Sequence, residues 1–380
     1  MQKFIFLIGI MLVSFILNAQ ESAQKAIRNH FENMLLKEDI HNGFLQIKSA
    51  DGELNFKLVS GNFQDGRVVR ESNPFHAASV GKMFTASIIM KLVETKEIRF
   101  EDPISKHLSP EIVNGLHLFE GKDYSNKITI KQLLQHTSGL ADYIMDEPED
   151  GRPNIITQMF EKPSKVWKIE ELITFSKTHL SPHFIPGNGY HYSDTDYLLL
   201  GLIIEEKYKK ALDEVFKEEL FIPLKMNHTA MFMRSEPIKE NDQLAEFYIN
   251  NNDISQYKSL SIDWAGGGTV STTEDLIRFH EALLSGKIIE ASTLASMQQW
   301  VHESQATYYG LGLRKIQINE FSEQLPNLTL IGHNGINASF LFYCPELDLY
   351  IAGTFNQTNQ VKESMLFMIN CLTEILANKQ

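Results

Sequence analysis

The sequence predicts an α+β fold in which the strands come from both ends of the chain and the helices come from its middle. Residues 43–60 alternate apolar and polar side chains around Asp51-Gly52, which is typical of a β-hairpin. Strand-like runs return late, at 328–331, 339–343 and 349–355. Residues between these parts favour helices and loops. We therefore predict one antiparallel sheet from about 40–75 and 262–360, flanked by terminal helices, with an inserted all-helical region at about 79–260.

The first segment has the pattern of a secretory signal. Lys3 precedes the apolar run Phe4–Leu17, which is shorter than the roughly 20 residues of a membrane-spanning helix, and the small residue Ala19 follows. We predict a signal peptide at 1–19 and a single domain at 20–380. An uncleaved N-terminal anchor is the alternative. A cleaved signal implies an exported protein, periplasmic or secreted, without membrane contact.

Further elements follow from apolar periodicity and from helix-end signals. Ser271-Thr272-Thr273-Glu274 has the form of a capping box, and the helix that it opens should run to Leu284, with Gly286 just beyond its end. Asp142–Pro153 is rich in Asp, Glu and Pro and is predicted to be a surface loop. Other predicted helices lie at 23–37, 79–95, 197–207 and the C-terminus.

Composition narrows the range of partners. The chain has 380 residues, of which 43% are hydrophobic, and its net charge of −13 comes without a basic cluster. This argues against nucleic acid and against anionic membranes as partners. Cys344 and Cys371 both lie in apolar stretches, which favours two buried free thiols, although an exported protein could also join them in one disulfide.

Ser79-Val80-Gly81-Lys82 carries the strongest chemical signal. A lysine three residues after a serine on a helix lies within reach of the serine hydroxyl, and a neutral lysine could take its proton. The same spacing occurs at Ser22–Lys25 and Ser255–Lys258, but only Ser79 precedes a helix that is apolar on almost every face. From this context alone, Ser79 is equally compatible with a helix N-cap.

Two later motifs are candidate partners for Ser79. In Tyr192-Ser193-Asp194, the tyrosine hydroxyl could shuttle protons, or Ser193 could simply cap the helix that follows. Gly332-His333-Asn334-Gly335 ends a predicted strand, and its glycines would let a substrate backbone approach the sheet. A plain β-turn is the alternative for this motif.

Several other chemistries find no support. The sequence has no Gly-x-Ser-x-Gly elbow, and Gly266-Gly267-Gly268 lacks the lysine of a phosphate loop, which leaves a tight bend near the cleft. His280-Glu281 and His302-Glu303 lack the second histidine of a zinc protease. His179, His183 and His191 have loop spacing and no acidic or cysteine partner nearby in the sequence. We therefore predict no metal and no cofactor.

Taken together, the motifs resemble those of the serine β-lactamase and D-alanyl-D-alanine carboxypeptidase superfamily, and most closely the class C β-lactamase-like serine hydrolases. Ser79-x-x-Lys82, Tyr192-x-Asp194 and His333-x-Gly335 occur in the order of that superfamily. Further matches span nearly the whole predicted domain: Leu133–Leu140, Tyr192–Gly201 and Gly266–Thr272. The resemblance implies a β-lactamase/transpeptidase-like fold and selects the catalytic interpretation of Ser79.

Within the resemblance, each motif residue acquires an expected role. Ser79 would be the acylated nucleophile, Lys82 would accept its proton, and Tyr192 would relay protons to the leaving group and to water. The oxyanion hole would consist of the backbone N–H groups of Ser79 and Ile336. The segment 136–139 would be structural, shaping a loop near the cleft.

Two departures from the family pattern stand out. Asp194 replaces the usual asparagine, and a carboxylate near Lys82 favours the protonated amine, which works against a general base. In the third motif, His333 stands where β-lactamases carry lysine, and Asn334 where a hydroxyl is common. Both replacements in the third motif, His333 and Asn334, weaken the usual anchor for a substrate carboxylate. The expectation is an enzyme that is not an efficient β-lactamase.

The sequence thus predicts an exported serine hydrolase that cleaves an ester or amide through an acyl-enzyme. Its substrate would be a small molecule or a peptide, with D-amino-acid peptides of the cell wall, esters and β-lactams as candidates. The alternative from another class is a non-catalytic penicillin- or peptidoglycan-binding module or sensor. Substrate pockets are expected at the loop Asp142–Pro153 and near 304–309.

Overall fold

The computed structural model describes residues 21–379, so the predicted signal at 1–19 lies outside the described residues. Residues 21–35 are helical, close to the helix predicted at 23–37. Within 21–379, no helix combines the length and the apolar character that crossing a bilayer requires.

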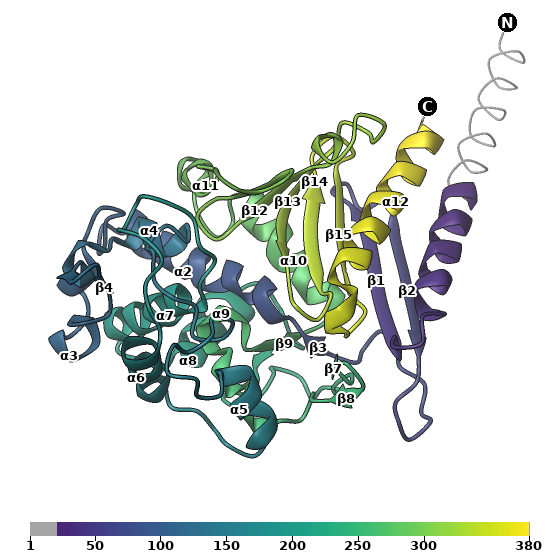
Figure 1. Ribbon diagram of the computed structural model, residues 1–380. Coiled ribbons are helices and arrows are strands. Elements are labelled where there is room, and N and C mark those ends of the chain that lie inside the picture. The colour runs from purple at the N-terminus through teal and green to yellow at the C-terminus, as the bar shows by residue number, and fades with distance from the viewer. Residues whose placement is uncertain (1–20, 380) are drawn as a thin grey trace, which may run out of the picture.

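One antiparallel sheet of eight strands confirms the predicted fold class (Figure 1). The N-terminal hairpin supplies β1 and β2, and β1 pairs with the late strand β15, placing Phe44 opposite Thr354. The two ends of the chain therefore meet inside the sheet. In spatial order the strands are β10 (Val301–Ser304), β11 (Thr307–Tyr309), β12 (Arg314–Gln317), β13 (Thr329–Asn334), β14 (Phe340–Cys344), β15 (Leu349–Thr354), β1 (Asn42–Ser49) and β2 (Asn55–Gly61).

Three strands at one side of the sheet, β10 to β12, were not predicted. The segment 304–309, expected to be a pocket-lining loop, instead joins β10 and β11 of this edge. These strands have only three or four residues each, and most of their side chains are partly exposed. They therefore lack the apolar run or the clear alternation that marks a strand in sequence.

Successive side chains of a strand point to opposite faces of the sheet, and different helices cover the two faces. Phe340 and Phe342 of β14 pack in one cluster with Phe31 of the 21–35 helix and with α12 (Val361–Lys379). Leu341, between them, belongs to the core on the opposite face, where α10 (Thr273–Leu284) lies. Figure 1 shows the two terminal helices side by side on one face, as predicted.

The start of α10 differs in detail from the prediction. Thr272 is the N-cap, and its hydroxyl accepts the backbone N–H of Asp275. Glu274 takes no part in a capping box, because its carboxylate pairs with Lys57 of β2 at 2.9 Å. The helix ends at Leu284 as predicted, and Gly286 follows with a positive φ of 77°.

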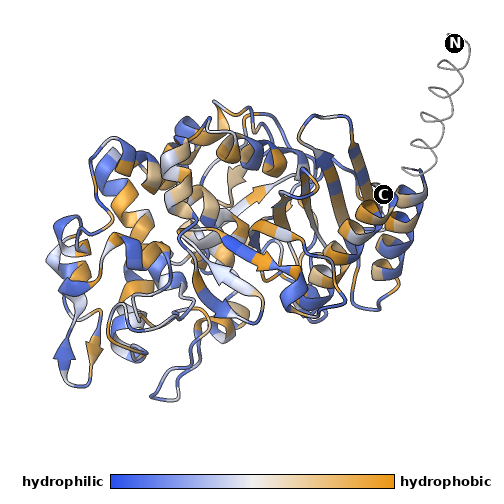
Figure 2. Ribbon diagram, turned by 90° about the horizontal axis from the view of Figure 1, so that it is seen from above, coloured by the Kyte–Doolittle hydropathy of each residue, from blue (hydrophilic) through white to orange (hydrophobic). Residues whose placement is uncertain are grey.

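The inserted region is predominantly helical and forms the other half of the molecule (Figure 1). Apolar stretches, orange in Figure 2, run through its helices, and α2 is buried on almost every side, as predicted. Besides helices, the region holds the small hairpins β4–β5 (Leu118–Phe119, Lys122–Asp123) and β7–β8 (Tyr248–Ile249, Asn252–Asp253). Its helices are α2 (Lys82–Glu94), α3 (Pro110–Val113), α4 (Ile130–Leu134), α5 (Ile155–Glu161), α6 (Ile169–His179), α7 (Asp194–Tyr208) and α8 (Leu212–Phe216), and α9 (Trp264–Gly267) and α11 (Ala291–Met297) follow.

Hydrogen bonds join the two halves next to Ser79. A small sheet of β3 (Phe75–His76), β9 (Thr269–Ser271) and β6 (Ala230–Met231) leads the chain to this position. The Asn337 amide, in the turn between β13 and β14, donates to the His76 carbonyl at 2.6 Å, and Ser339 Oγ donates to the Ala77 carbonyl at 2.8 Å. The segment that carries Ser79 is thereby fixed against the end of the large sheet.

Both cysteines are buried free thiols, as predicted. Cys344 ends β14 and Cys371 lies within α12. Burial raises the pKa of the Cys344 thiol to about 12, which keeps it protonated and unreactive.

Candidate active site

Ser79 lies in a 3-10 turn, Ala78–Gly81, that leads directly into α2. The N-cap positions of the turn and of the helix are Ala77 and Gly81, and no side chain caps either one. The Ser79 hydroxyl is therefore not a helix cap. Its Oγ instead lies 3.3 Å from Lys82 Nζ, one turn along.

Lys82 is completely buried, and three oxygen atoms surround its ammonium. Besides Ser79 Oγ, these are the carbonyl of Gly266 at 2.8 Å and a carboxylate oxygen of Asp194, to which it forms an ion pair. Burial lowers the pKa of Lys82, but attraction to Asp194 and to Tyr192 outweighs burial and raises the pKa above its ordinary value. Lys82 thus carries a proton at neutral pH.

Tyr192 lies just before Ser193, the N-cap residue of α7, and its ring centroid lies 4.9 Å from Lys82 Nζ. Burial raises the pKa of Tyr192 to about 12, although the Lys82 cation and a hydrogen bond with Ser79 act in the opposite direction. The structure therefore brings Ser79, Lys82 and Tyr192 together, with Asp194 on the far side of the lysine.

The segment 136–139 holds Tyr192 in place. His136 adopts a left-handed backbone with φ of 56°, and its buried ring lies 4.3 Å from the Tyr192 ring. Its carbonyl accepts the His191 N–H at 3.0 Å, and its Nδ1 accepts the Ser193 N–H at 3.2 Å. Ser193 does not cap α7 with its side chain, because its hydroxyl donates to the Ala141 carbonyl at 2.9 Å.

Two further carboxyl groups near Lys82 escaped the sequence analysis. Burial and repulsion from Asp194 raise the pKa of Asp263 to about 7 and raise the pKa of Asp142 well above its usual range. One buried ammonium cannot neutralise three carboxylates, so Asp142 holds its proton and Asp263 titrates near neutral pH. Neither residue carries a motif that would mark it in the sequence.

The third motif is present at the end of β13, but it presents no cation of its own. His333 is fully buried, and its Nε2 lies 2.9 Å from the Tyr309 hydroxyl. Burial and the positive charges of Arg314 and Lys82 hold the pKa of His333 well below its usual value, so the ring is neutral. It cannot substitute for a lysine at this position.

Arg314 of β12 supplies the missing charge, and sequence reasoning did not find it. Its guanidinium forms a bidentate pair with Glu303 and donates to the side-chain carbonyl of Asn334 in the third motif. Its Cζ lies 5.6 Å from the Tyr192 ring centroid. In the sequence, the only local sign of this site residue is an arginine beside the apolar run 310–313. Because β12 was not predicted, nothing in the sequence placed Arg314 near Tyr192.

Two backbone N–H groups of residues that line the cavity beside the nucleophile have no partner in the described part of the chain. Among the described residues, neither the Ser79 N–H nor the Ile336 N–H donates a hydrogen bond to another protein atom. Ile336 follows Gly335, at which a Cβ would lie 2.8 Å from the Cβ of Ala78. At Gly267, a Cβ would lie 2.4 Å from the Ala78 carbonyl oxygen. Both glycines therefore permit the close approach that leaves these amides free.

An apolar cavity of about 190 Å³ opens beside Ser79. The loop Asp142–Pro153 contributes Ile144 and Met145 to its wall, as expected for this loop. Asp194 and Asp263 are its acidic members. The remaining wall is chiefly hydrophobic and includes Ile156, Met159, Phe232, Phe247, Ile249, Ile254, Leu260, Ile262 and Ile336, and His76, Ala78, Tyr192 and Gly268 complete it.

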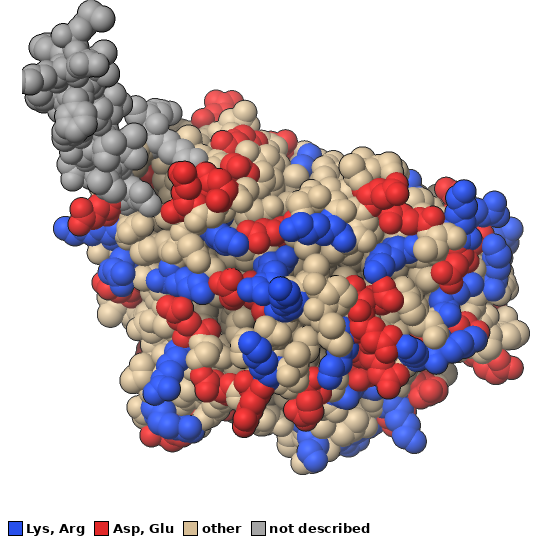
Figure 3. Space-filling model, turned by 180° about the vertical axis from the view of Figure 1, so that it is seen from behind, with Lys and Arg blue, Asp and Glu red and all other residues tan. Residues whose placement is uncertain are grey.

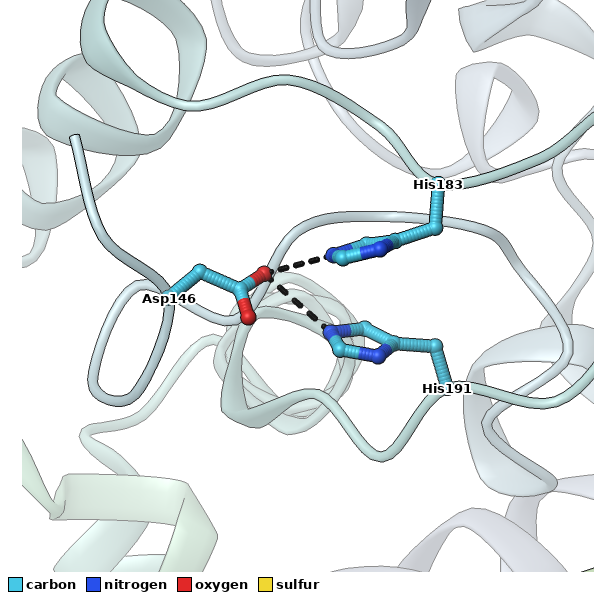
Figure 4. Close-up of side chains that lie close together, drawn as sticks. All are labelled: Asp146, His183 and His191. Carbon is cyan, nitrogen blue, oxygen red and sulfur yellow. Dashed lines mark hydrogen bonds and ion pairs between the residues drawn. The ribbon is translucent and has the colours of Figure 1, made fainter. Parts of the chain in front are cut away.

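The loop histidines do have acidic partners, contrary to expectation. His183 and His191 both contact Asp146 (Figure 4). His179 lies 3.2 Å from Asp150. The carboxylates come from the segment 142–154, which is distant in sequence and folds back beside the histidines.

Comparison with known proteins agrees with this geometry. The Beta-lactamase family model matches residues 47–366. Penicillin-binding protein 4* of Bacillus subtilis is 26% identical over 291 residues, which cover 73% of this chain and 59% of that protein. The chain thus spans little more than half the length of this relative.

Solved structures of similar fold include two amidohydrolases. D-amino acid amidase from Ochrobactrum anthropi SV3, complexed with D-phenylalanine, matches with a TM-score of 0.76 at 22% identity, over 96% of this chain and all of the other. A D-stereospecific amidohydrolase from Streptomyces sp. matches with a TM-score of 0.72 at 24% identity, over 89% of this chain and 94% of the other. The family model covers most of the sequence and the fold agrees with it, so this chain belongs to the beta-lactamase family.

Proposed function

We propose that the protein is an exported serine hydrolase that cleaves an ester or amide bond of a small molecule or peptide through an acyl-enzyme on Ser79. The observation that carries the proposal is the placement of Ser79 Oγ 3.3 Å from Lys82 Nζ and beside Tyr192. The backbone amides of Ser79 and Ile336, which line the same cavity, have no hydrogen-bond partner among the described residues. Membership of the beta-lactamase family supports it. The signal-like pattern at 1–19 is the support for export.

In the proposed mechanism, Ser79 Oγ attacks the substrate carbonyl carbon and its proton passes to Tyr192. The Lys82 cation lowers the pKa of Tyr192 and so favours the phenolate that accepts this proton. The Ser79 and Ile336 amides stabilise the resulting oxyanion. Tyr192 then protonates the leaving group, and it later activates the water that breaks the ester to Ser79.

Lys82 acts here as a fixed positive charge rather than as the base. Asp194 favours its protonated form, so the amine has no free electron pair with which to take the serine proton. Of the two groups beside Ser79 Oγ, this leaves Tyr192 to carry the proton.

The walls of the cavity support a substrate with an apolar acyl or side-chain group. Ile144, Met145 and Ile156 offer no hydrogen-bonding side chain, whereas Asp194 and Asp263 supply negative charge at one place in the wall. A substrate carboxylate would meet repulsion there. The neutral His333 gives it no compensating cation, and the Arg314 guanidinium is already paired with Glu303, which argues against efficient β-lactam hydrolysis.

The face of the molecule shown in Figure 3 gives no reason to propose a polyanionic partner. On the face in Figure 3, acidic and basic side chains are interspersed, and neither sign forms a broad continuous field. This fits a small-molecule or peptide substrate, with cell-wall peptides among the candidates.

Mass spectrometry of the intact protein with a fluorophosphonate or a labelled penicillin tests the proposal. We expect an adduct on Ser79 that is absent in Ser79→Ala, and we expect turnover of at least one class among p-nitrophenyl esters, D-Ala-D-Ala peptides and β-lactams. A permanent acyl adduct with every substrate would instead favour the sensor alternative. Absence of any adduct would refute acylation at Ser79.

A further inference from the structure

Three metal-binding side chains converge on one point outside the catalytic cluster (Figure 4). Asp146 Oδ2 lies 2.7 Å from His183 Nε2 and 3.1 Å from His191 Nε2. The two imidazole rings stack with centroids 3.6 Å apart. The candidate ligand atoms of the three residues all lie within 4.8 Å of one another.

The separations of 2.7 and 3.1 Å are those of hydrogen bonds, and they would lengthen by less than about 1 Å on binding a metal ion. In a tetrahedral Zn²⁺ site with bonds of about 2.0–2.2 Å, the ligand atoms lie roughly 3.3–3.6 Å apart, so small side-chain shifts would seat the ion. The two rings stack with their centroids 3.6 Å apart, and Asp146 Oδ2 contacts the Nε2 atom of each, so one ion could reach all three side chains. The side chains are 22–39% exposed, which leaves a path for the ion and room for a water ligand.

Each of the three candidate ligand residues has its own hydrogen bond with a backbone group. The His183 N–H donates to the Gly139 carbonyl at 2.9 Å, and the His191 N–H donates to the His136 carbonyl at 3.0 Å. Asp146 Oδ2 accepts the Asp142 N–H at 2.8 Å. The segment 136–139 therefore anchors both histidines beside the turn that presents the carboxylate, and the cluster is preorganised.

We propose that Asp146, His183 and His191 form a binding site for a divalent transition-metal ion, with Zn²⁺ the best match to two imidazoles and one carboxylate. Mg²⁺ and Ca²⁺ prefer all-oxygen sites and would bind poorly. The site lies apart from the serine chemistry, and metal binding does not depend on the proposed hydrolase activity.

The position of the site gives the metal a structural task. Asp146 follows Met145, which lines the substrate cavity, and His191 precedes Tyr192. A metal ion would tie the cavity loop Asp142–Pro153 to the segment that carries Tyr192. The ion would thereby fix the loop and Tyr192 relative to each other without touching the substrate.

Calorimetric titration of EDTA-treated, dialysed protein with ZnCl₂ tests the site. We expect one equivalent of Zn²⁺ to bind, an upward shift of the unfolding temperature, and no heat of binding with MgCl₂. His183→Ala, His191→Ala and Asp146→Asn should each weaken Zn²⁺ binding at least about tenfold. With CoCl₂, the wild-type protein should show the visible absorption band of Co²⁺ bound in a site of low symmetry. Each of the three variants should lack this band.

His179→Ala is the matched control, because His179 has a single acidic partner, Asp150, in the same part of the fold. It should bind Zn²⁺ like the wild type. Wild-type stoichiometry and affinity in His183→Ala and His191→Ala, with both variants folded by circular dichroism, would overturn the proposal, as would the absence of any Zn²⁺ binding to the wild type. None of these measurements depends on enzyme activity. A failure of the metal-site proposal can therefore be distinguished from a failure of the proposed hydrolase function.

Discussion

The Lys82 ammonium, 3.3 Å from the Ser79 hydroxyl, forms an ion pair with the Asp194 carboxylate, and the two side chains are 0% and 8% exposed. Removing one partner from such a buried pair leaves an uncompensated charge, at a cost of about 3–5 kcal/mol in the free energy of unfolding. The pair therefore sets both the stability of the site and the protonation state of the lysine.

Asp194→Asn should shift the acidic limb of the pH–rate profile to lower pH. Asp194 raises the pKa values of both Lys82 and Tyr192, so its neutralisation lowers both and makes either base available at lower pH. The measurement is kcat/KM of a p-nitrophenyl ester between pH 5 and pH 10, with unfolding followed in parallel. An unmoved acidic limb in a folded variant would mean that the carboxylate does not tune the proton acceptor.

Arg314→Met should slow the reaction and move the acidic limb in the opposite direction. Arg314 lowers the pKa of Tyr192, and each unit of increase in that pKa reduces the phenolate population about tenfold. The pH dependence of kcat is the measurement.

The double variant Glu303→Gln/Arg314→Met separates this effect from misfolding. The single Arg314→Met variant leaves the Glu303 carboxylate, only 12% exposed, without its cation, and the second change removes that charge. We expect the double variant to regain stability but not rate. Recovery of both would assign Arg314 a purely structural role.

Gly267→Ala should reduce kcat by roughly 10²–10³, the usual effect of losing one oxyanion donor. The added Cβ would lie 2.4 Å from the Ala78 oxygen and 2.9 Å from the Ser79 nitrogen, so the backbone that carries the nucleophile must move. Gly121→Ala is the control, since its φ of 76° strains an added side chain as well, but no atom lies within 4 Å of its Cβ position. Equal kcat in the two variants would show that the Ser79 amide tolerates displacement.

His280→Leu should stabilise the protein, and more so in acid. Among the described residues, neither ring nitrogen of this fully buried histidine has a hydrogen-bond partner, and burial lowers its pKa from 6.5 to about 3. Between these values the unfolded chain binds a proton that the folded protein excludes, so His280 reduces stability as pH falls below 6.5. The gain on substitution should therefore be about 2 kcal/mol larger at pH 5 than at pH 8, measured by urea unfolding. A gain independent of pH would contradict this account.

Ile156→Trp should restrict the acyl group that the cavity accepts. Ile156 lies in the cavity wall, and a larger side chain there would exclude long acyl chains before short ones. We expect the ratio of kcat/KM for p-nitrophenyl hexanoate to that for the acetate to fall at least about tenfold. Leu118→Trp, at a position 57% exposed in the β4–β5 hairpin, should leave the ratio unchanged. An unchanged ratio in Ile156→Trp would place the acyl group outside this cavity.

The sequence predicted those parts of the fold whose signals are local. The hairpin at 43–60, the strands of 328–355 and the buried helix after Ser79 each carry a periodicity that one segment is long enough to display. The strands β10 to β12 do not, because they are short and half-exposed. Because these strands were not predicted, Arg314, which lies on β12, was not recognised as a site residue.

The candidate active site and the proposed metal site show the same difference between contacts that are local in the sequence and contacts that are not. Ser79 and Lys82 are one turn apart, so their contact could be anticipated from spacing alone. Asp146 is 37 and 45 residues from its two histidine partners, and no short pattern records such a contact. Those contacts depend on where loops fold back, which follows from packing of the whole chain.

The hydrogen bonds that join the two halves beside Ser79 have a consequence during synthesis. One proposed oxyanion donor comes from residue 79, near the beginning of the chain, and the other from residue 336, near its end. A ribosome-bound chain that has already folded its nucleophile still lacks the second amide and the strand that holds it. The growing polypeptide thus has no competent catalytic centre until residue 336 and the strand that holds it have been made, long after the nucleophile itself.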